Sequence, residues 1–162
     1  MNIGIIGLGL MGGSLAKAIK KYGLAKNVYG YARKQKTIDE INELNLVDKV
    51  VSLEELKELC DVIILAIPVD SILAMMNDLK DIRKDTTIID LGSTKEIIAS
   101  NIPTELRENF IPAHPMTGTE KFGPKAAIDG LYEEKIVVMC NLDENSALHK
   151  NRAVKIFEVI GM

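Results

Sequence analysis

The stretch Gly7-Leu8-Gly9-Leu10-Met11-Gly12 follows the apolar run 3–6 and precedes a helix-forming segment that begins at Gly13. An apolar run, a glycine turn and a helical segment in this order predict a strand, a tight turn and a helix start. In such a unit Gly7 makes the turn, Gly9 lets a pyrophosphate contact the backbone, and Gly12 lets the helix pack closely on the strand. The free amides of the helix start then face the phosphates. The pattern therefore predicts dinucleotide binding.

Length and composition limit the class of protein. With 162 residues, 47% of them apolar, the chain is expected to form one dinucleotide-binding domain over 1–162. The net charge is −3 and the positive residues are dispersed, so neither a nucleic acid nor an anionic membrane surface is expected as a partner. Apolar runs such as 62–66 are too short to cross a membrane, and Met1 leads directly into the first strand without a basic leader. We expect a cytoplasmic protein.

The two cysteines predict no redox or metal chemistry. Cys60 and Cys140 lack CxxC spacing and flank predicted core strands. Buried free thiols are the expected state of such residues in a reducing compartment. No metal site is expected.

Strand and helix patterns alternate along the rest of the chain, and Gly23 is expected to end the first helix. Further strands are predicted at 28–32, 50–51, 61–67, 86–91, 110–113 and 136–140, and further helices at 36–45, 53–59, 71–79, 94–101 and 144–160. This succession predicts an α/β fold of the Rossmann type, a doubly wound, mostly parallel sheet with helices on both faces. Ligands of such sheets bind beyond the carboxyl ends of the strands.

Two predicted strand ends carry residues suited to a ligand. The run Ala66-Ile67-Pro68 offers small and ring-locked side chains that can line a ribose, although it can equally serve only to end a strand. The next strand ends in Asp90-Leu91-Gly92-Ser93-Thr94-Lys95. Ser93 or Thr94 can cap the following helix, and a cap is compatible with a catalytic hydroxyl.

A third strand end contains His114, one of two histidines in the chain. Pro115 restricts the backbone of His114 to an extended conformation, so the imidazole is held by a stiff element. A positioned imidazole can abstract a proton from a hydroxyl at neutral pH, although a histidine at a strand end can also be a structural hydrogen bonder. The other histidine, His149, lies in the polar stretch 145–151, and we expect it to be solvated and without a role.

Four segments together carry a specific resemblance. They are Gly-Leu-Gly-Leu-Met-Gly-Gly-Ser-Leu-Ala from Gly7, Ala-Ile-Pro-Val from Ala66, Asp-Leu-Gly-Ser-Thr-Lys from Asp90 and Ala-His-Pro-Met-Thr-Gly-Thr-Glu from Ala113. In this order and spacing the chain resembles the prephenate and arogenate dehydrogenases of tyrosine biosynthesis over essentially its whole length. The glycine turn is common to many oxidoreductases, whereas the last two segments are much more selective.

The resemblance implies an oxidative decarboxylation of prephenate to 4-hydroxyphenylpyruvate, or of arogenate to tyrosine. It implies that His114 binds the C4 hydroxyl and accepts its proton, and that Ser93 orients the histidine and the nicotinamide. Thr119 and Glu120 are implied to lie in a loop at the substrate entrance. The cofactor-binding residues expected from the motifs are Gly7, Gly9, Leu10, Met11, Gly12, Ala32, Arg33, Lys34, Ala66, Ile67, Pro68 and Ser93.

The end of the second predicted strand departs from the pattern of NAD enzymes. It reads Tyr31-Ala32-Arg33-Lys34 and lacks the acidic residue that usually binds the adenosine ribose. Arg33 and Lys34 stand where a 2′-phosphate would lie, so NADP is favoured over NAD as the cofactor. The alternative is that both are solvated loop charges.

The sequence stops at Met162. Enzymes of the resembled family continue into a helical domain that supplies the dimer interface, substrate contacts and an arginine for the carboxylates. The resemblance implies that this chain is the cofactor-binding half, with little turnover by itself, and that the full-length enzyme is a homodimer.

Two other functions remain open. The β-hydroxyacid dehydrogenases and related imine reductases also begin with Gly-Leu-Gly-x-Met-Gly, but they rely on a lysine of their second domain and lack the histidine segment. A regulatory module that binds NAD(P) without chemistry is the other alternative.

Overall fold

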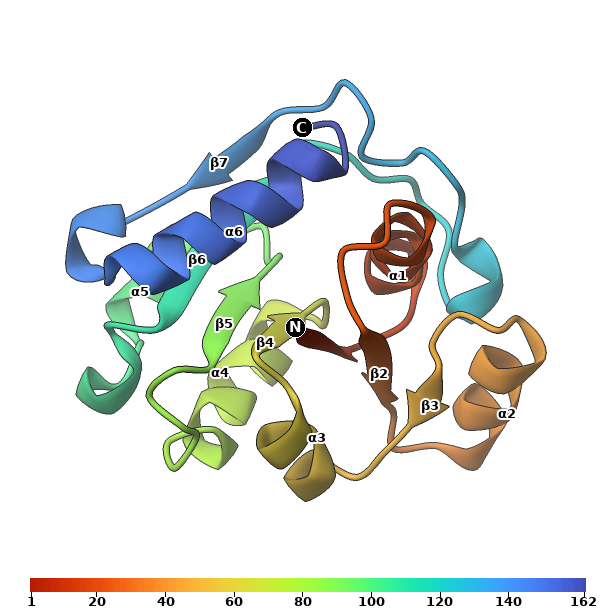
Figure 1. Cartoon of the computed structure of the whole chain (residues 1–162), viewed down its shortest axis with the longest axis horizontal. Coiled ribbons are helices and arrows are strands. Elements are labelled where there is room, and N and C mark those ends of the chain that lie inside the picture. Colours follow the sequence, from red (N-terminus) through yellow and green to blue (C-terminus); the bar gives the residue numbers. More distant parts are fainter.

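Seven strands form one sheet in the order β3-β2-β1-β4-β5-β6-β7 in the computed structural model, which describes residues 1–162 (Figure 1). All neighbouring strands are parallel except β6 and β7, which are antiparallel. Helices cover both faces of the sheet. The predicted doubly wound, mostly parallel fold is confirmed.

The elements follow the predicted alternation closely. The strands are β1 (Asn2–Ile6), β2 (Asn27–Tyr31), β3 (Lys49–Val50), β4 (Val62–Leu65), β5 (Thr87–Asp90), β6 (Phe110–Pro115) and β7 (Val137–Met139). The α-helices are α1 (Leu10–Lys21), α2 (Gln35–Glu43), α3 (Leu53–Leu59), α4 (Val69–Asp78), α5 (Lys95–Ser100) and α6 (Ala147–Val159). Three short 3₁₀ turns complete the chain: η1 (Thr104–Leu106), η2 (Pro124–Ala126) and η3 (Leu142–Glu144).

The central strand β4 explains why an unbroken apolar run suits this fold. All four of its residues are at most 1% exposed. Val62 and Ile64 point into one core cluster, and Ile63 and Leu65 point into the other. Successive side chains of a strand face opposite sides, so a strand covered on both faces needs an apolar residue at every position.

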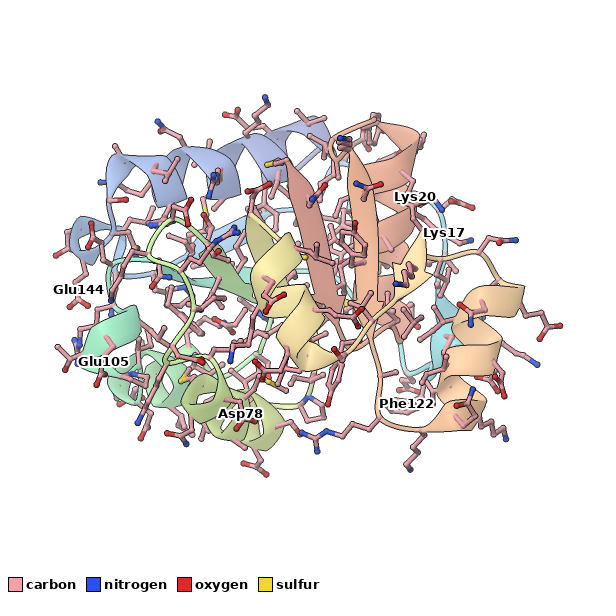
Figure 2. All side chains as sticks on the ribbon, turned by 60° about the horizontal axis from the view of Figure 1, so that its bottom comes forward. Lys17, Lys20, Asp78, Glu105, Phe122 and Glu144 are labelled. Carbon is pink, nitrogen blue, oxygen red and sulfur yellow. The ribbon has the colours of Figure 1, made fainter.

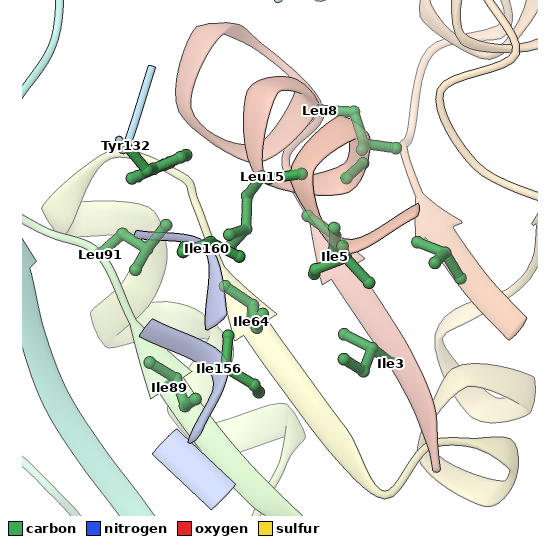
Figure 3. Close-up of a cluster of buried hydrophobic side chains, with 14 of the residues drawn as sticks. Ile3, Ile5, Leu8, Leu15, Ile64, Ile89, Leu91, Tyr132, Ile156 and Ile160 are labelled. Carbon is green, nitrogen blue, oxygen red and sulfur yellow. The ribbon is translucent and has the colours of Figure 1, made fainter. Parts of the chain in front are cut away.

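Two hydrophobic cores result, one on each face of the sheet. The first joins the sheet to α1, α2 and α6, and Figure 3 shows Leu15 of α1 and Ile156 of α6 against the strand residues Ile5, Ile64 and Ile89. The second joins the sheet to α3, α4 and α5. Complete burial of one such side chain contributes about 1.5–3 kcal/mol, so these layers fix the positions of the strand ends.

The last helix is shorter than the sequence pattern predicts. Residues Leu142–Glu144 form a 3₁₀ turn after Asn141, whose φ of 54° lies in the left-handed region. This turn separates β7 from α6, and the helix begins at Ala147 rather than at 144. The edge strand is likewise trimmed from the predicted 136–140 to Val137–Met139.

The prediction for His149 is wrong. Its side chain is 2% exposed, because α6 packs this face against β5. The ring nitrogens lie 2.8 Å from the Thr87 hydroxyl and 3.1 Å from the Lys84 carbonyl oxygen. Since a carbonyl can only accept, Nε2–H donates to Lys84 and Nδ1 accepts from Thr87. Burial lowers the pKa of this imidazole.

Both cysteines are free thiols, with Cys60 buried and Cys140 half-buried. Burial raises the pKa of the Cys60 thiol to about 12, as expected for an unreactive core thiol. No cluster of three or more histidine, cysteine or acidic side chains is arranged to hold a metal ion. None of the helices combines the length and apolar character needed to cross a bilayer.

Candidate functional site

The glycine turn between β1 and α1 has the geometry that its sequence predicts. Gly7 has a φ of 92°, a conformation that L side chains rarely adopt. A Cβ at Gly12 would lie 1.9 Å from the Gly7 carbonyl oxygen, so α1 packs against the turn at a distance only glycine allows. A Cβ at Gly9 would meet no atom closer than Gly123 N at 3.8 Å. A side chain is therefore excluded at Gly7 and Gly12, whereas a methyl group at Gly9 would be in ordinary van der Waals contact with Gly123.

The turn lies where the sheet reverses its winding. From β1 the chain proceeds to β2 and β3 on one side, and from β4 to β5 and β6 on the other. Helices leaving the carboxyl ends of β1 and β4 therefore diverge, and a crevice opens between them. Doubly wound sheets bind their ligands in this crevice.

A cavity of about 450 Å³ occupies the crevice and brings four chain segments together. Its walls come from the glycine turn, the loop after β4, the loop after β5 and the end of β6 with the loop that follows it. The lining residues are Leu10, Met11, Ala66, Ile67, Pro68, Val69, Leu91, Gly92, Ser93, His114, Pro115, Thr117, Gly118, Thr119 and Phe122. His114 and Ser93 thus share one cavity with five of the expected cofactor-binding residues, Leu10, Met11, Ala66, Ile67 and Pro68.

His114 is half-buried near the carboxyl end of β6, paired across the sheet with Val138. Its Nδ1 is buried and has no hydrogen-bonding partner in the protein. Most buried polar atoms are paired, so the unpaired Nδ1 of a residue that lines this cavity makes His114 a candidate functional residue. Ser93 lines the same cavity with an exposed side chain, and no hydrogen bond joins it to His114.

A buried ion pair at the end of β5 fixes the start of the loop that contains Ser93. Asp90, fully buried at the end of β5, contacts the Lys95 ammonium and accepts a hydrogen bond of 2.9 Å from the Gly92 amide. Burial raises the pKa of the Asp90 carboxyl and lowers the pKa of the Lys95 ammonium, whereas their mutual attraction opposes both shifts. These contacts fix the backbone immediately before Ser93. The helix N-cap is Thr94, and its side chain makes no capping hydrogen bond.

A second cavity, of about 240 Å³, continues from the other side of the glycine turn. It is lined by Ile6, Gly7, Leu8, Tyr31, Ala32, Arg33, Thr37, Ile67, Ser71 and Met75. Arg33 is exposed at its rim, whereas Lys34 lines neither cavity. The structure therefore distinguishes Arg33, which lines a cavity, from Lys34, which does not, although the sequence analysis assigned both to the same site.

Some predicted residues do not line the cavities, and some lining residues were not predicted. Gly9, Gly12 and the exposed Glu120 line neither cavity. Thr119, the neighbour of Glu120, lines the larger one. The lining residues that were not among the predicted site residues are Ile6, Leu8, Tyr31, Thr37, Val69, Ser71, Met75, Leu91, Gly92, Pro115, Thr117, Gly118 and Phe122. A usable signal existed for Thr37 and Ser71, because both lie in the first turn of a helix that follows a predicted ligand-facing strand end.

Comparison with known proteins identifies the family that the four sequence segments resemble. Residues 15–162 match the family model described as "Prephenate dehydrogenase, nucleotide-binding domain". The chain belongs to this family. It is 34% identical over 144 residues to the cyclohexadienyl dehydrogenase of Zymomonas mobilis, a match that covers 85% of this chain and 48% of that protein. It is 34% identical over 141 residues to the prephenate dehydrogenase of Lactococcus lactis, covering 83% and 39%.

Solved structures of this family have the same fold as the chain. Prephenate dehydrogenase from Aquifex aeolicus, in complex with hydroxyphenyl propionate and NAD⁺, superimposes with a TM-score of 0.91 and 29% identity over 99% of this chain and 57% of that one. Synechocystis arogenate dehydrogenase gives a TM-score of 0.90 at 28% identity, covering 100% and 58%. The chain spans less than half the length of the curated relatives it matches.

Proposed function

We propose that this chain is the cofactor-binding half of an NAD(P)-dependent dehydrogenase that oxidatively decarboxylates prephenate or arogenate. The observation that carries the proposal is the cavity that His114 and Ser93 share with Leu10 and Met11 of the glycine turn. Membership of the family and the likeness to an Aquifex enzyme solved with NAD⁺ and hydroxyphenyl propionate support it.

The residues present fit a dinucleotide. Gly9 has no side chain to block a pyrophosphate, and the start of α1 directs unpaired amides and the positive end of the helix dipole toward that position. Ala66 and Pro68 contribute small or rigid surface to the wall of the same cavity, which suits a ribose. The chemistry that a bound nicotinamide supplies is acceptance of a hydride from C4 of the substrate ring.

His114 is proposed as the base. An imidazole accepts a proton only while it is neutral, and the buried, unpartnered Nδ1 leaves this ring free of competing hydrogen bonds. In the proposed reaction His114 takes the proton of the C4 hydroxyl as the hydride leaves C4. The bond between ring C1 and its carboxylate then breaks and releases carbon dioxide. The electron pair of that bond moves into the ring, which becomes aromatic, and the C4 oxygen takes a proton back to become the phenol. Ser93 is proposed to orient the imidazole once ligands bind.

NADP is the proposed preferred cofactor. Ala32 occupies the position where an acidic residue would bind the ribose hydroxyls of NAD, and Arg33 and Thr37 line the cavity beside it. An arginine and a hydroxyl can together bind a phosphate, the former through charge-assisted hydrogen bonds. A 2′-phosphate in this cavity would therefore meet a cation and a donor rather than a carboxylate.

The cofactor preference is tested by calorimetric titration with NADPH and NADH. We expect Arg33→Ala to weaken NADPH binding about tenfold, the value of one lost charge-assisted contact, and to leave NADH binding within twofold of the wild type. Lys34→Ala is the matched control, with a smaller effect because this side chain lines neither cavity. A wild-type preference for NADH would disprove the NADP assignment.

The reaction is tested in the natural polypeptide that carries this chain. We expect prephenate- or arogenate-dependent reduction of the cofactor, followed by its absorbance. A protein that binds the cofactor but reduces it with neither substrate would instead support the regulatory module. Homodimerisation of that natural polypeptide, which the family resemblance implies, is tested by its mass in solution.

A further inference from the structure

Phe122 is the most exposed of the large hydrophobic side chains, at 91%. Figure 2 labels it at the surface of the molecule. Single exposed apolar residues are common in proteins, and exposure alone assigns no role. Phe122 differs from the next most exposed, Ile136 at 70%, because it also lines the cavity that contains His114.

The segment around Phe122 is fixed at both ends and free between them. On one side the Thr117 hydroxyl donates to the Leu131 carbonyl oxygen at 3.1 Å. On the other side the Ile128 amide donates to the Ser14 hydroxyl at 3.0 Å, which ties the chain after η2 to α1. Residues 118–122 make only one side-chain hydrogen bond, from the Lys121 amide to the Thr119 hydroxyl within the segment.

Glycines with left-handed φ values lie at the two ends of this free segment. Gly118 has a φ of 152° and Gly123 a φ of 80°. A Cβ at Gly123 would meet no atom within 4 Å, so space around this residue does not restrict its rotation. Small changes at two such positions can swing the intervening residues without disturbing the anchored ends.

The free segment passes over the glycine turn. Gly123 N lies 3.8 Å from the position that a Cβ of Gly9 would occupy, and the corresponding position at Gly118 lies 4.0 Å from Met11 Sδ. A dinucleotide at Gly9 would therefore contact this segment and displace it. The proximity favours the cofactor over a substrate ring as the surface that Phe122 meets.

We propose that Phe122 covers the nicotinamide half of the bound dinucleotide and holds it in the cavity. This inference rests on the proposed cofactor binding and adds a residue that the glycine, serine and histidine motifs do not contain. The segment 118–122 swings at its glycines until the aromatic ring lies on the nicotinamide riboside. Apolar surface that is fully hydrated in the free protein is then buried, and its burial slows cofactor release.

Affinity measurements with a fragment separate this role from a general loss of structure. We expect Phe122→Ala to weaken binding of the preferred cofactor, NADPH or NADH, about tenfold. Binding of its adenosine fragment, 2′,5′-ADP or AMP, should stay within twofold of the wild type, because the fragment lacks the nicotinamide half. Ile136→Ala is the matched control, since that residue is also exposed and apolar but lines a different cavity.

A second measurement uses the absence of tryptophan from the chain. Phe122→Trp introduces a single tryptophan, whose emission should be strongly quenched by energy transfer to a bound reduced nicotinamide and unaffected by the adenosine fragment. Ile136→Trp should be quenched less.

Each outcome decides the proposal. Unchanged cofactor affinity in Phe122→Ala, or an equal loss for cofactor and fragment, would overturn the role of Phe122 and leave the proposed cofactor binding intact. Equal quenching of the two tryptophan variants would overturn it as well. A wild-type protein that binds neither dinucleotide would overturn both proposals.

Discussion

The two histidines lie at opposite ends of the same sheet and differ in burial and in hydrogen bonding. His114 is near the carboxyl end of β6, half-buried, with Nδ1 unpartnered beside a cavity. His149 packs at the amino end of β5, 2% exposed, with both ring nitrogens hydrogen-bonded. A structural histidine satisfies its nitrogens within the protein, whereas a histidine that handles protons keeps one available for a ligand. The comparison predicts that their replacement will affect different properties.

Replacement of His114 should give the largest effect, and it should be confined to catalysis. In the natural polypeptide that carries this chain, His114→Asn is expected to lower the rate of substrate-dependent cofactor reduction about 10³-fold, because asparagine cannot accept the proton at neutral pH. Cofactor affinity, measured by calorimetry, should stay within twofold. A variant that retains a tenth of wild-type activity would remove His114 from the role of base.

Replacement of His149 should act on stability alone. His149→Ala leaves the Thr87 hydroxyl and the Lys84 carbonyl without their buried partner and is expected to lower the free energy of unfolding by about 2 kcal/mol. Chemical denaturation measures this change. Cofactor affinity at denaturant concentrations below the unfolding transition should not change. A loss of cofactor affinity without a loss of stability would contradict a purely structural role for His149.

A smaller loss is expected when only the hydroxyl that faces His149 is removed. Thr87 also accepts a hydrogen bond of 3.3 Å from Arg152, so Thr87→Val is expected to cost about 1 kcal/mol of unfolding free energy. Thr86→Val is the matched control: its hydroxyl is equally buried but donates to the Cys60 carbonyl oxygen instead. Both variants lose a hydrogen bond, but only the Thr87 variant should change the pH dependence described next.

The smallest effect is a pH dependence of stability. Burial lowers the pKa of His149, so the unfolded chain binds a proton more readily than the folded protein. The stabilising contribution is therefore complete above the unfolded pKa of about 6.5 and is lost as the pH falls below it. Denaturation midpoints measured between neutral and mildly acidic pH should fall more steeply for the wild type than for His149→Ala. If the midpoints of both proteins fall equally with pH, another titratable group determines the pH dependence of stability in this range.

Local sequence was sufficient for the parts of the molecule that depend on neighbouring residues. The glycine turn and the strand β4 could be predicted from their own residues. A turn with positive φ requires glycine, and a strand covered on both faces requires apolar residues throughout. The position of His114 followed in the same way, since carboxyl ends of parallel strands share one edge of the sheet. Its role and that of Ser93 stay predictions.

The rest depends on contacts between distant residues. His149 stands in a polar stretch that predicts exposure, but its partners lie 62 and 65 residues away in sequence. Asn145 in the same stretch is also buried, and its side-chain amide donates to the carbonyl oxygens of Arg107 and Phe110. Polar residues that bond to remote backbone groups look like solvated ones in a single sequence. Phe122 was missed for a related reason, because only the folded loop brings it to the cavity.

The close approach of Gly12 to the carbonyl of Gly7 has a consequence for ligand recognition. Helix and turn interlock as the chain folds, so the amides that meet a phosphate are preorganised and lose little conformational entropy when a ligand arrives. A rigid turn of this kind cannot adapt its shape to one dinucleotide rather than another. Discrimination between cofactors must therefore arise in the two cavities that adjoin the turn.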